Sequence, residues 1–382
     1  MWSNKTSTHL NVNPNSSNVL KAQWNDWDGD WQQLYINTIG STSDKVIGVD
    51  LSEALYAQKK GVVFRDQNGN AKDVFDIFYE NGYKWLRVRV NIEPDSNDYA
   101  MFTDLAYATE VGVIAKELGF KLLVDFHYSN WWADPGNQWT PYSWRTSSIT
   151  ALCTTAYNWT VGAMQTLINA GAEPDMVQIG NEINYGIMWD LGNVGTSTSN
   201  WTNVAWLINS GINAVEDAGS DADIMIHTAT GGSWSETSSW ISNFINAGGQ
   251  WSDVDAYGVS YYPMWHGSTS DLSYNMAMLD RTYDKDIYVI ETAYYWDTNE
   301  CGYSGSEVPY SQNEQGQYDF LQAVKSAVSS YSDVKGIFYW GAAWAQSNKW
   351  LSASGWDNDD ASRRSLFDDN GYATKGLTGL ID

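Results

Sequence analysis

The stretch Asp175-Met176-Val177-Gln178-Ile179-Gly180-Asn181-Glu182-Ile183 lies near the middle of the chain and decides how the rest is interpreted. An apolar run followed by Gly-Asn-Glu predicts a buried strand over 175–183 that ends in an amide and a carboxylate. A charged side chain is rarely buried without a partner, so a carboxylate at this place faces either solvent or a functional site. We therefore interpret Glu182 as a candidate catalytic acid.

Outward from this stretch the same kind of run recurs along the chain. Further short apolar strands are predicted at 46–50, 85–90, 122–127, 224–227, 256–262, 287–291 and 336–340. Amphipathic stretches between them predict helices at 72–81, 99–118, 148–170, 201–218 and 269–283, with further helices around 243–245 and 320–331. Gly119 and Gly171 stand where two of these helices should end.

Eight strand–helix units of this kind predict an α/β fold, a closed (β/α)8 barrel over 45–382. Continuous apolar strands are typical of a parallel sheet buried on both faces. An open doubly wound sheet is the alternative, but Gly48-Val49-Asp50-Leu51-Ser52 after the first strand is not a dinucleotide-binding fingerprint. Residues 1–44 are polar and poorly periodic, and we interpret them as an N-terminal extension, the remnant of a preceding module.

The charge and composition exclude some partners and favour another. The 382 residues carry a net charge of −25, which argues against nucleic acid and anionic membrane surfaces as partners. No apolar run is long enough to span a membrane. The 22 Trp and 24 Tyr favour carbohydrate, because aromatic faces pack against sugar rings and their polar tips bond hydroxyl groups.

The two cysteines and the N-terminus give weaker expectations. Cys153 and Cys301 form no disulfide framework, and we expect them not to be bridged. The first residues lack the apolar segment of a signal peptide. We expect a monomer that is secreted or held at the cell surface after a signal has been removed.

The ends of the predicted strands supply the candidate site, because active sites of this barrel lie at the C-terminal ends of its strands. Glu182 and Glu291 end the fourth and seventh strands, so their carboxyl groups can converge across the barrel mouth. Glycosidic cleavage needs such a pair, one carboxyl group that gives a proton to the leaving oxygen and another that attacks the sugar or activates water. We therefore expect Glu182 and Glu291 to form the catalytic pair, with Glu182 as the acid.

The other strand-end side chains are candidates for substrate binding. Asn181 is placed to hydrogen-bond a sugar hydroxyl, and an arginine beside the nucleophile would lower the pKa of that carboxyl group. Of Arg87 and Arg89 we expect one to point into the barrel and the other toward the helices, and we assign Arg87 to the site. Together with tryptophans of the loops, the predicted substrate-binding residues are Asp50, Arg87, His127, Trp131, Trp132, Asn181, His227, Tyr261, Trp340 and Trp344. We also expect Trp296 to line the cleft.

Over about 46–380 the chain resembles family 53 of the glycoside hydrolases, the endo-β-1,4-galactanases. The matching motifs fall in order along the whole barrel: Gly48-Val49-Asp50-Leu51-Ser52, Leu86-Arg87-Val88-Arg89-Val90, Trp132-Ala133-Asp134-Pro135-Gly136, Pro174 to Ile183, Gly258-Val259-Ser260-Tyr261-Tyr262-Pro263, Val289-Ile290-Glu291-Thr292-Ala293-Tyr294 and Phe338-Tyr339-Trp340. The sequence departs from the family after the last strand, where Trp340-Gly341-Ala342-Ala343-Trp344 stands in place of Trp-Glu-Pro-Ala-Trp.

The resemblance implies hydrolysis of internal β-1,4 bonds in galactan, of pectin or type I arabinogalactan, with retention at the anomeric carbon. It implies Glu182 as acid/base and Glu291 as nucleophile. It implies no required cofactor. Some bacterial members bind calcium with the loop after strand seven, and the oxygens available here for a structural calcium are those of Asp297, Asn299 and Glu300, whose spacing matches no dedicated cage.

Other readings stay open on the residues alone. Endo-β-1,4-mannanases, glucanases and xylanases of the same barrel clan share the two glutamates, so they are the nearest alternative. A non-catalytic carbohydrate-binding barrel would keep the aromatic cleft but could dispense with one glutamate. A metal-dependent hydrolase would need several histidines in ligand spacing, and the chain has four His and no His-x-His.

Overall fold

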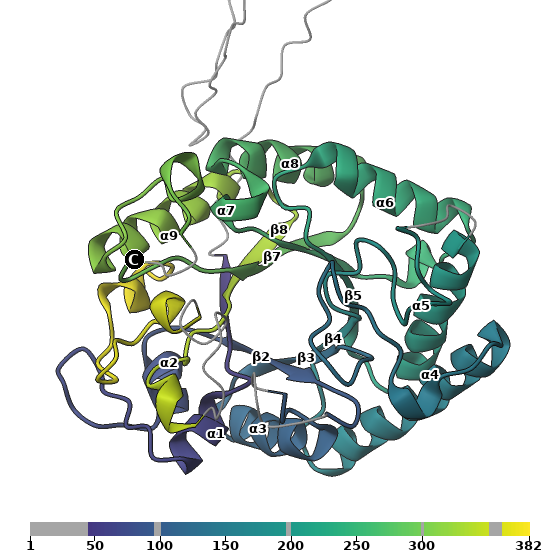
Figure 1. The fold of residues 1–382 in the computed structure, drawn as a ribbon, viewed down its shortest axis with the longest axis horizontal. Coiled ribbons are helices and arrows are strands. Elements are labelled where there is room, and N and C mark those ends of the chain that lie inside the picture. The colour runs from purple at the N-terminus through teal and green to yellow at the C-terminus, as the bar shows by residue number, and fades with distance from the viewer. Residues whose placement is uncertain (1–44, 95–100, 196–199, 299–301, 351–360) are drawn as a thin grey trace, which may run out of the picture. The chain divides into compact units, whose positions relative to one another are not determined.

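The computed structural model describes residues 45–94, 101–195, 200–298, 302–350 and 361–382. Eight parallel strands close into a barrel in chain order, and the last strand pairs with the first (Figure 1). The strands are β1 (Val46–Asp50), β2 (Trp85–Val90), β3 (Lys121–Phe126), β4 (Met176–Ile179), β5 (Asp223–Thr228), β6 (Ala256–Ser260), β7 (Asp286–Thr292) and β8 (Val334–Tyr339). The predicted (β/α)8 barrel is confirmed, while the extension predicted for 1–44 lies outside the described residues.

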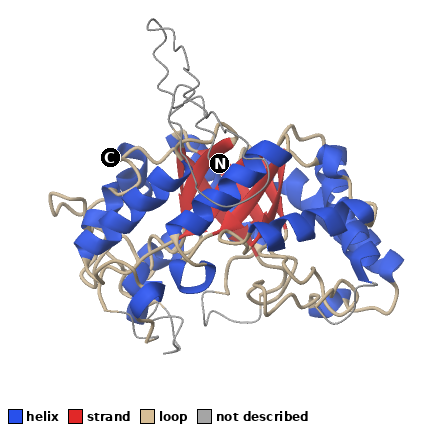
Figure 2. Ribbon diagram, turned by 90° about the horizontal axis from the view of Figure 1, so that it is seen from above, coloured by secondary structure: helices blue, strands red, loops and turns tan. Residues whose placement is uncertain are grey.

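Helices surround the barrel on its outside (Figure 2). They are α1 (Ala54–Lys59), α2 (Val74–Glu80), α3 (Leu105–Leu118), α4 (Ile149–Asn169), α5 (Trp201–Asp217), α6 (Trp234–Asn246), α7 (Pro263–His266), α8 (Thr269–Thr282) and α9 (Glu314–Val328). The sequence did not predict α1 and α7, because 6 and 4 residues are too few to show a helical period.

The ends of the long helices follow from local chemistry. The Asp104 side chain caps α3 by accepting the backbone N–H of Tyr107, and Gly119 ends that helix at φ 91°, a conformation that costs a residue with a Cβ atom. At α8, Ser268 and Asp271 cap each other's backbone in a capping box. These capping interactions determine the residues at which the helices begin and end.

The inside of the barrel is layered. Inward-facing apolar side chains fill its lower part: Trp85, Leu123, Met176, Met225, Ala256, Tyr288, Ile290 and Phe338. Toward the C-terminal ends of the strands the next inward-facing side chains are polar and at most 5% exposed: Asp50, Arg87, Asp125, Gln178, His227, Ser260 and Glu291. A buried polar layer on a packed apolar one is expected where a barrel of this type carries its site.

A bulge in β7 aims Glu291 at this layer. Val289 pairs with Val259 and Glu291 pairs with Ser260, so β7 contains one extra residue opposite β6. The same insertion appears against β8, where Val289 and Thr292 pair with Ile337 and Tyr339. Strict alternation would place Ile290 and Glu291 on opposite faces of the sheet, and the bulge lets both face the barrel interior.

Two sequence expectations concern features outside this core. Among the described residues no helix has both the length and the apolarity that crossing a bilayer requires. Cys153 on α4 is a free, partly exposed thiol. Cys301 lies outside the described residues, so the expected absence of a bridge stays a prediction.

Candidate active site

Arg87 is the centre of the buried polar layer. Its Nη1 donates to Asp50 Oδ2 at 3.0 Å and to Glu291 Oε1 at 2.7 Å. Its Nη2 donates to Asp125 Oδ2 at 2.7 Å and to Asn181 Oδ1 at 2.8 Å. Burial alone would raise the pKa of Asp125, but the positive charge of Arg87 and the contact with His127 hold that pKa below its ordinary value. One guanidinium on β2 therefore orients side chains from the ends of four other strands.

Glu291 is held on both carboxylate oxygens. Arg87 donates to Oε1, and the Tyr262 hydroxyl donates to Oε2 at 3.1 Å. Burial raises the pKa of Glu291, and Arg87 opposes that rise. Among the carboxyl groups that face the cavity, a glutamate paired with a buried arginine is suited to stay ionised, as a nucleophile must.

Glu182 lies just beyond β4, on a strained turn. The predicted strand 175–183 stops at Ile179, because Gly180 and Glu182 adopt left-handed backbone conformations with φ of 80° and 48°. Such a conformation costs a non-glycine residue on the order of 1–3 kcal/mol, and it is common at active sites. The N–H of Ile183 bonds the carbonyl oxygen of His227 at 3.1 Å, and Gln138 Nε2 bonds the carbonyl oxygen of Asn181 at 2.7 Å, which holds the turn.

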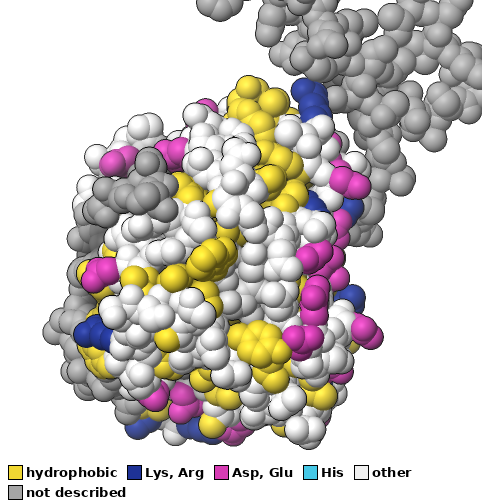
Figure 3. All heavy atoms as spheres, turned by 90° about the vertical axis from the view of Figure 1, so that its right-hand side faces the viewer, with side chains coloured by type: hydrophobic (Ala, Val, Ile, Leu, Met, Phe, Trp, Pro, Cys, Tyr) yellow, Lys and Arg dark blue, Asp and Glu magenta, His cyan; other side chains and the backbone are white. Residues whose placement is uncertain are grey.

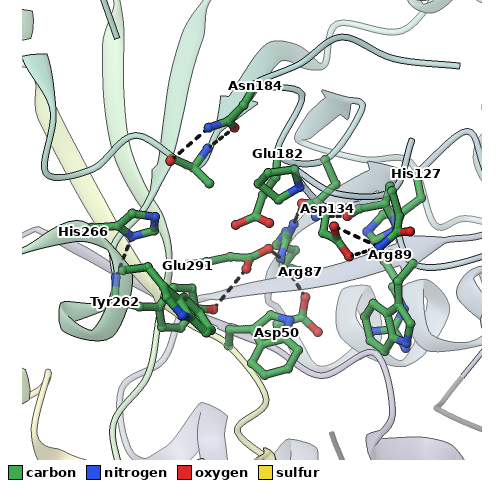
Figure 4. Close-up of a pocket in the computed structure, with 18 of the residues that line it drawn as sticks. Asp50, Arg87, Arg89, His127, Asp134, Glu182, Asn184, Tyr262, His266 and Glu291 are labelled. Carbon is green, nitrogen blue, oxygen red and sulfur yellow. Dashed lines mark hydrogen bonds and ion pairs between the residues drawn. The ribbon is translucent and has the colours of Figure 1, made fainter. Parts of the chain in front are cut away.

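The two glutamates have different environments. Figure 4 shows the carboxyl groups of Glu182 and Glu291 turned toward one another in the cavity. Burial and the negative charge of Glu291 raise the pKa of Glu182 well above its ordinary value. Arg87 pairs with Glu291 and not with Glu182, so a proton shared by the two groups is favoured on Glu182. Such a pair is suited to combine a carboxylic acid with a carboxylate.

The cavity above the pair has a volume of about 770 Å³ and an aromatic wall. Trp132 lies 6.4 Å, centroid to centroid, from both Trp340 and Trp344, and the Arg89 guanidinium covers it at 4.1 Å. Trp131 and Trp265 add further ring surface to the lining. Flat apolar surface beside fixed polar groups is the lining expected of a sugar-binding cleft.

Most of the predicted substrate-binding residues line this cavity. The structure brings together, with the two glutamates, Asp50, Arg87, His127, Trp131, Trp132, Asn181, Trp340 and Trp344. His127 is oriented by Asp125 at 2.9 Å from Nε2 and by the N–H of Ala133 at 3.3 Å from Nδ1. The Asn181 amide donates to the Ala133 carbonyl oxygen at 2.8 Å, so part of its expected donor capacity is used within the protein.

Three predicted positions are corrected. Tyr261 is buried away from the cavity, where its ring stacks on Phe320 and its hydroxyl donates to the Gly267 carbonyl oxygen. The neighbouring Tyr262 lines the cavity instead. His227 is fully buried beneath Asn181 and does not reach the cavity surface. Trp296 donates its ring N–H to the Ser362 carbonyl oxygen and is absent from the lining.

The expected separation of Arg87 and Arg89 is also wrong. Residues two apart on a strand share a face, so both side chains point into the barrel. Arg89 binds Glu53 Oε1 at 2.5 Å and lines the cavity with Arg87.

Several residues of the site were not predicted from the sequence. Asp125 lies inside the predicted strand 122–127, and a carboxylate within a buried strand was a signal that could have found it. Tyr262 and Ser260 belong to the predicted strand 256–262. To select them in place of Tyr261, one must know at which residue the strand ends, and the sequence did not show this.

The calcium ligands suggested by the sequence receive little support. Asp297 is half exposed and lies 3.5 Å from Arg363. Asn299 and Glu300 lie outside the described residues. Within the described ranges no cluster of three or more His, Cys, Asp or Glu is arranged to hold a metal ion.

Removing the central arginine is expected to destabilise the protein. In Arg87→Ala, three buried carboxyl groups lose their cation, and breaking such a buried pair costs about 3–5 kcal/mol. Lys59→Ala, which breaks an exposed pair with Glu110, should cost about 1 kcal/mol or less. Urea unfolding of both variants measures the difference.

The destabilisation should also depend on pH. Without Arg87 the folded-state pKa values of Asp125 and Glu291 lie above their unfolded values, so the folded state is penalised as these groups ionise. The loss of stability in Arg87→Ala should therefore be larger at pH 8 than at pH 5. An equal loss at both pH values would show that the guanidinium does not balance these charges.

Comparisons with known proteins agree with this arrangement. The sequence pattern of Glycosyl hydrolase family 53 matches residues 46–380. An arabinogalactan endo-beta-1,4-galactanase of Thermothelomyces thermophilus is 34% identical over 340 residues, which cover 87% of this chain and 97% of that protein. The enzyme of the same name from Humicola insolens is 34% identical over 343 residues, with the same coverage.

Solved structures give the same picture. The Ignisphaera aggregans GH53 catalytic domain superposes with a TM-score of 0.81 at 35% identity, covering 90% of this chain and 98% of that one. A structure of fungal beta-1,4-galactanases gives 0.78 at 32% identity, covering 88% and 98%. Xylanase B from Clostridium stercorarium F9 gives 0.55 at 15% identity, covering 87% and 99%, a likeness of fold alone.

Proposed function

The chain belongs to glycosyl hydrolase family 53 and is a glycoside hydrolase, and from this premise we propose that it cleaves internal β-1,4 bonds of galactan with retention of anomeric configuration. The observation that carries the mechanism is the unequal environment of the two glutamates. Glu291 is paired with Arg87 and Tyr262, whereas Glu182 faces it in the cavity with its pKa raised. The substrate is inferred from the relatives named galactanases.

In the first step a Glu291 carboxylate oxygen attacks C1 of the galactosyl unit. The C1–O4 bond breaks, and its electron pair stays on the leaving oxygen, which takes the proton of Glu182. A covalent galactosyl ester of Glu291 results. In the second step the ionised Glu182 removes a proton from water, the water oxygen attacks C1, and the ester bond breaks to restore the Glu291 carboxylate. Two inversions give net retention.

Arg87 and Tyr262 act on Glu291 through its two oxygens. Their hydrogen bonds stabilise the carboxylate before attack and again when it departs as the leaving group of the second step. The protein's own residues thus supply every proton and charge that the two steps require, and the proposed reaction involves no cofactor.

The proposal has a direct test in the products. We expect galacto-oligosaccharides from linear galactan and no products from β-1,4-mannan, xylan or glucan under the same conditions. Proton NMR at early times should show new reducing ends in the β configuration. Oligosaccharides from one of the other polymers alone would favour the mannanase, glucanase or xylanase reading, and absence of products from all four would favour a non-catalytic barrel. New reducing ends in the α configuration would contradict the retaining mechanism.

A polysaccharide substrate also bears on where the enzyme acts. A long galactan chain does not cross a membrane, which supports action outside the cell or at its surface. That the enzyme works as a monomer stays a prediction.

A second hollow extends the cleft on the side of the loop after β3. Its volume is about 430 Å³, and it shares Trp131 and Asn137 with the main cavity. Trp139 and Tyr142 line it and are 45% and 57% exposed, and the Arg145 guanidinium covers the Tyr142 ring at 4.4 Å. Continuity with the main cavity and exposed ring faces fit additional galactosyl units of a long chain.

Removing an aromatic side chain from this second hollow should weaken binding of long galactan chains but not of short ones. Because a ring contact contributes about 0.5–1.5 kcal/mol, Trp139→Ala should raise KM for polymeric galactan about 3- to 10-fold. KM for the shortest cleaved oligosaccharide should stay unchanged. Trp206→Ala, which removes a similarly exposed ring on α5 outside both hollows, is the matched control. An equal rise of KM for short and long substrates would show that the hollow does not bind the distal part of the chain.

A further inference from the structure

A chain of hydrogen bonds leads from Glu182 into the buried polar layer, and the proposed mechanism does not use it. Glu182 Oε1 lies 2.5 Å from the Ser260 hydroxyl, and Ser260 Oγ lies 2.9 Å from Nε2 of His227. Nδ1 of His227 lies 2.9 Å from Oδ1 of Asn181. Ser260 and His227 are fully buried, so no solvent is available to satisfy their polar atoms. The position of each hydrogen therefore follows from its neighbours.

Asn181 determines the hydrogen positions at the far end of this chain of hydrogen bonds. Its Nδ2 donates to the Ala133 carbonyl oxygen at 2.8 Å, which identifies the other amide atom as the oxygen. That oxygen also accepts a hydrogen bond from Arg87 Nη2 at 2.8 Å. An oxygen facing Nδ1 of His227 at 2.9 Å requires a hydrogen on Nδ1.

Among the described residues, Gln178 is the other polar group within hydrogen-bond distance of Nδ1, and its hydrogens have better acceptors. Its Nε2 lies 3.1 Å from Nδ1 and 3.1 Å from Asn181 Oδ1, but it lies 2.8 Å from Asp125 Oδ1 and 3.0 Å from the Gly180 carbonyl oxygen. An amide nitrogen has two hydrogens, and the two shortest contacts use both. The His227 ring is fully buried, and its nitrogens contact no carboxylate within the described ranges. Burial therefore lowers the pKa of His227 well below its ordinary value, and the ring is neutral. Nε2 therefore carries a lone pair.

The lone pair on Nε2 decides what Ser260 does. A hydroxyl group has one hydrogen, and Nε2 can only accept it. The side of Ser260 Oγ that faces Glu182 then has lone pairs alone, and a hydrogen bond across this contact requires the proton to be on the Glu182 carboxyl group. We propose that His227, acting through Ser260, holds the acid proton on Glu182 in the resting enzyme, so that both are positioning residues of the catalytic acid. This inference rests on the proposed function of Glu182.

The same chain favours return of the proton in each cycle. When Glu182 has given its proton to the leaving oxygen, the Ser260 hydroxyl can turn toward the new carboxylate, but His227 Nε2 then loses its donor. The ionised state of Glu182 thus leaves one buried acceptor without a hydrogen bond, which carries a free-energy cost. Taking a proton from water in the second step restores the full chain.

Charged and titratable groups from other elements also surround Glu182 and His227, and they act in every variant compared. They are Arg87 on β2, Asp125 on β3, His127 and Asp134 in the loop after β3, His266 on α7 and Glu291 on β7. None of them contacts the Ser260 hydroxyl in the part of the chain that the structure describes. A change confined to Ser260 therefore leaves their charges in place and reports on the hydrogen-bond chain.

Nitrogen NMR of the wild-type protein tests, without a variant, which atom donates in each of these hydrogen bonds. With four histidines in the sequence, the signals of the His227 ring can be assigned. We expect His227 to be neutral at pH 7, with hydrogen on Nδ1 and none on Nε2. Hydrogen on Nε2, or a charged ring, would overturn the proposal because Ser260 would then donate to an ionised Glu182.

The pH profile of Ser260→Ala gives the functional test. In kcat/KM the acidic limb reports ionisation of Glu291 and the basic limb reports loss of the Glu182 proton. Removing the hydroxyl takes the acceptor from the protonated carboxyl group, so the basic limb should move about half a unit to one unit toward lower pH while the acidic limb stays. Ser365→Ala, which removes another buried hydroxyl bonded to a backbone carbonyl oxygen, should leave both limbs in place.

The outcomes separate the two proposals. A shift of the basic limb to higher pH would mean that Ser260 donates to the ionised carboxylate, and an unchanged limb would mean that it does not act on Glu182. Either result overturns the positioning role. If Glu182→Ala itself keeps a basic limb, the assignment of Glu182 as the acid fails instead.

Discussion

Replacing Glu291 with alanine is expected to abolish turnover of galactan while the fold is kept. Loss of a covalent nucleophile lowers kcat on the order of 10⁶-fold in hydrolases that work through a covalent intermediate. The side chain comes from a bulge in β7, and its truncation leaves Arg87 with Asp50 and Asp125 as partners, so the buried cation stays compensated. Initial rates on galactan, with circular dichroism to check folding, measure the effect.

Added azide should restore turnover of Glu291→Ala on an aryl β-galactobioside with a good leaving group. Azide fits the space left by the carboxylate and attacks C1 from the same side, so one displacement gives the α-galactosyl azide. Glu110→Ala, a surface glutamate paired with Lys59, is the matched control and should behave as the wild type. Recovery of the β-azide, or no recovery at any azide concentration, would count against Glu291 as the nucleophile.

Replacing Glu182 with alanine is expected to lower kcat on galactan by about 10²- to 10⁴-fold, the usual contribution of a general acid or base. The effect should depend on the leaving group. An oligosaccharide hydroxyl leaves poorly without a proton, whereas an activated phenol needs none, so formation of the galactosyl ester from the aryl substrate should be nearly unaffected. A rapid burst of phenol followed by slow turnover is expected, because no base remains to activate water.

Azide again distinguishes the roles. In Glu182→Ala it should attack the galactosyl ester of Glu291 and give the β-galactosyl azide, the opposite anomer to that from Glu291→Ala. The two variants together thus assign the nucleophile and the acid independently. Equal losses of rate on galactan and on the activated substrate would contradict Glu182 as the proton donor, and the strained turn at φ 48° would then need another explanation.

Much of the barrel could be predicted from the sequence because its signals are local. The strands at 46–50 and 85–90 were predicted with the observed bounds, since short apolar runs bounded by polar residues are typical of parallel strands. Gly119 marked the end of α3 through its own backbone conformation. Glu182 and Glu291 could be named because both follow such runs.

The site residues that were predicted wrongly depend on strand ends and on contacts between strands, which a linear sequence pattern does not show. Choosing Tyr262 over Tyr261 depends on where β6 ends, and adjacent residues on a strand point to opposite faces. His227 was expected in the cleft, but it is fully buried between Gln178 on β4 and Ser260 on β6. Arg87 and Arg89 are two residues apart on β2 and therefore share a face, so their common orientation is already contained in the sequence.

By itself, then, the sequence determined the eight-stranded order and the two strand ends that carry glutamates, because these depend on residues within a few positions of each other. The tertiary structure alone decided that the bulge in β7 turns Glu291 inward, that one arginine joins Asp50, Asp125, Glu291 and Asn181, and that Ser260 and His227 stand behind Glu182. These features arise from pairings between strands far apart in the chain. Their energies depend on burial and distance, which come into being only when the barrel closes.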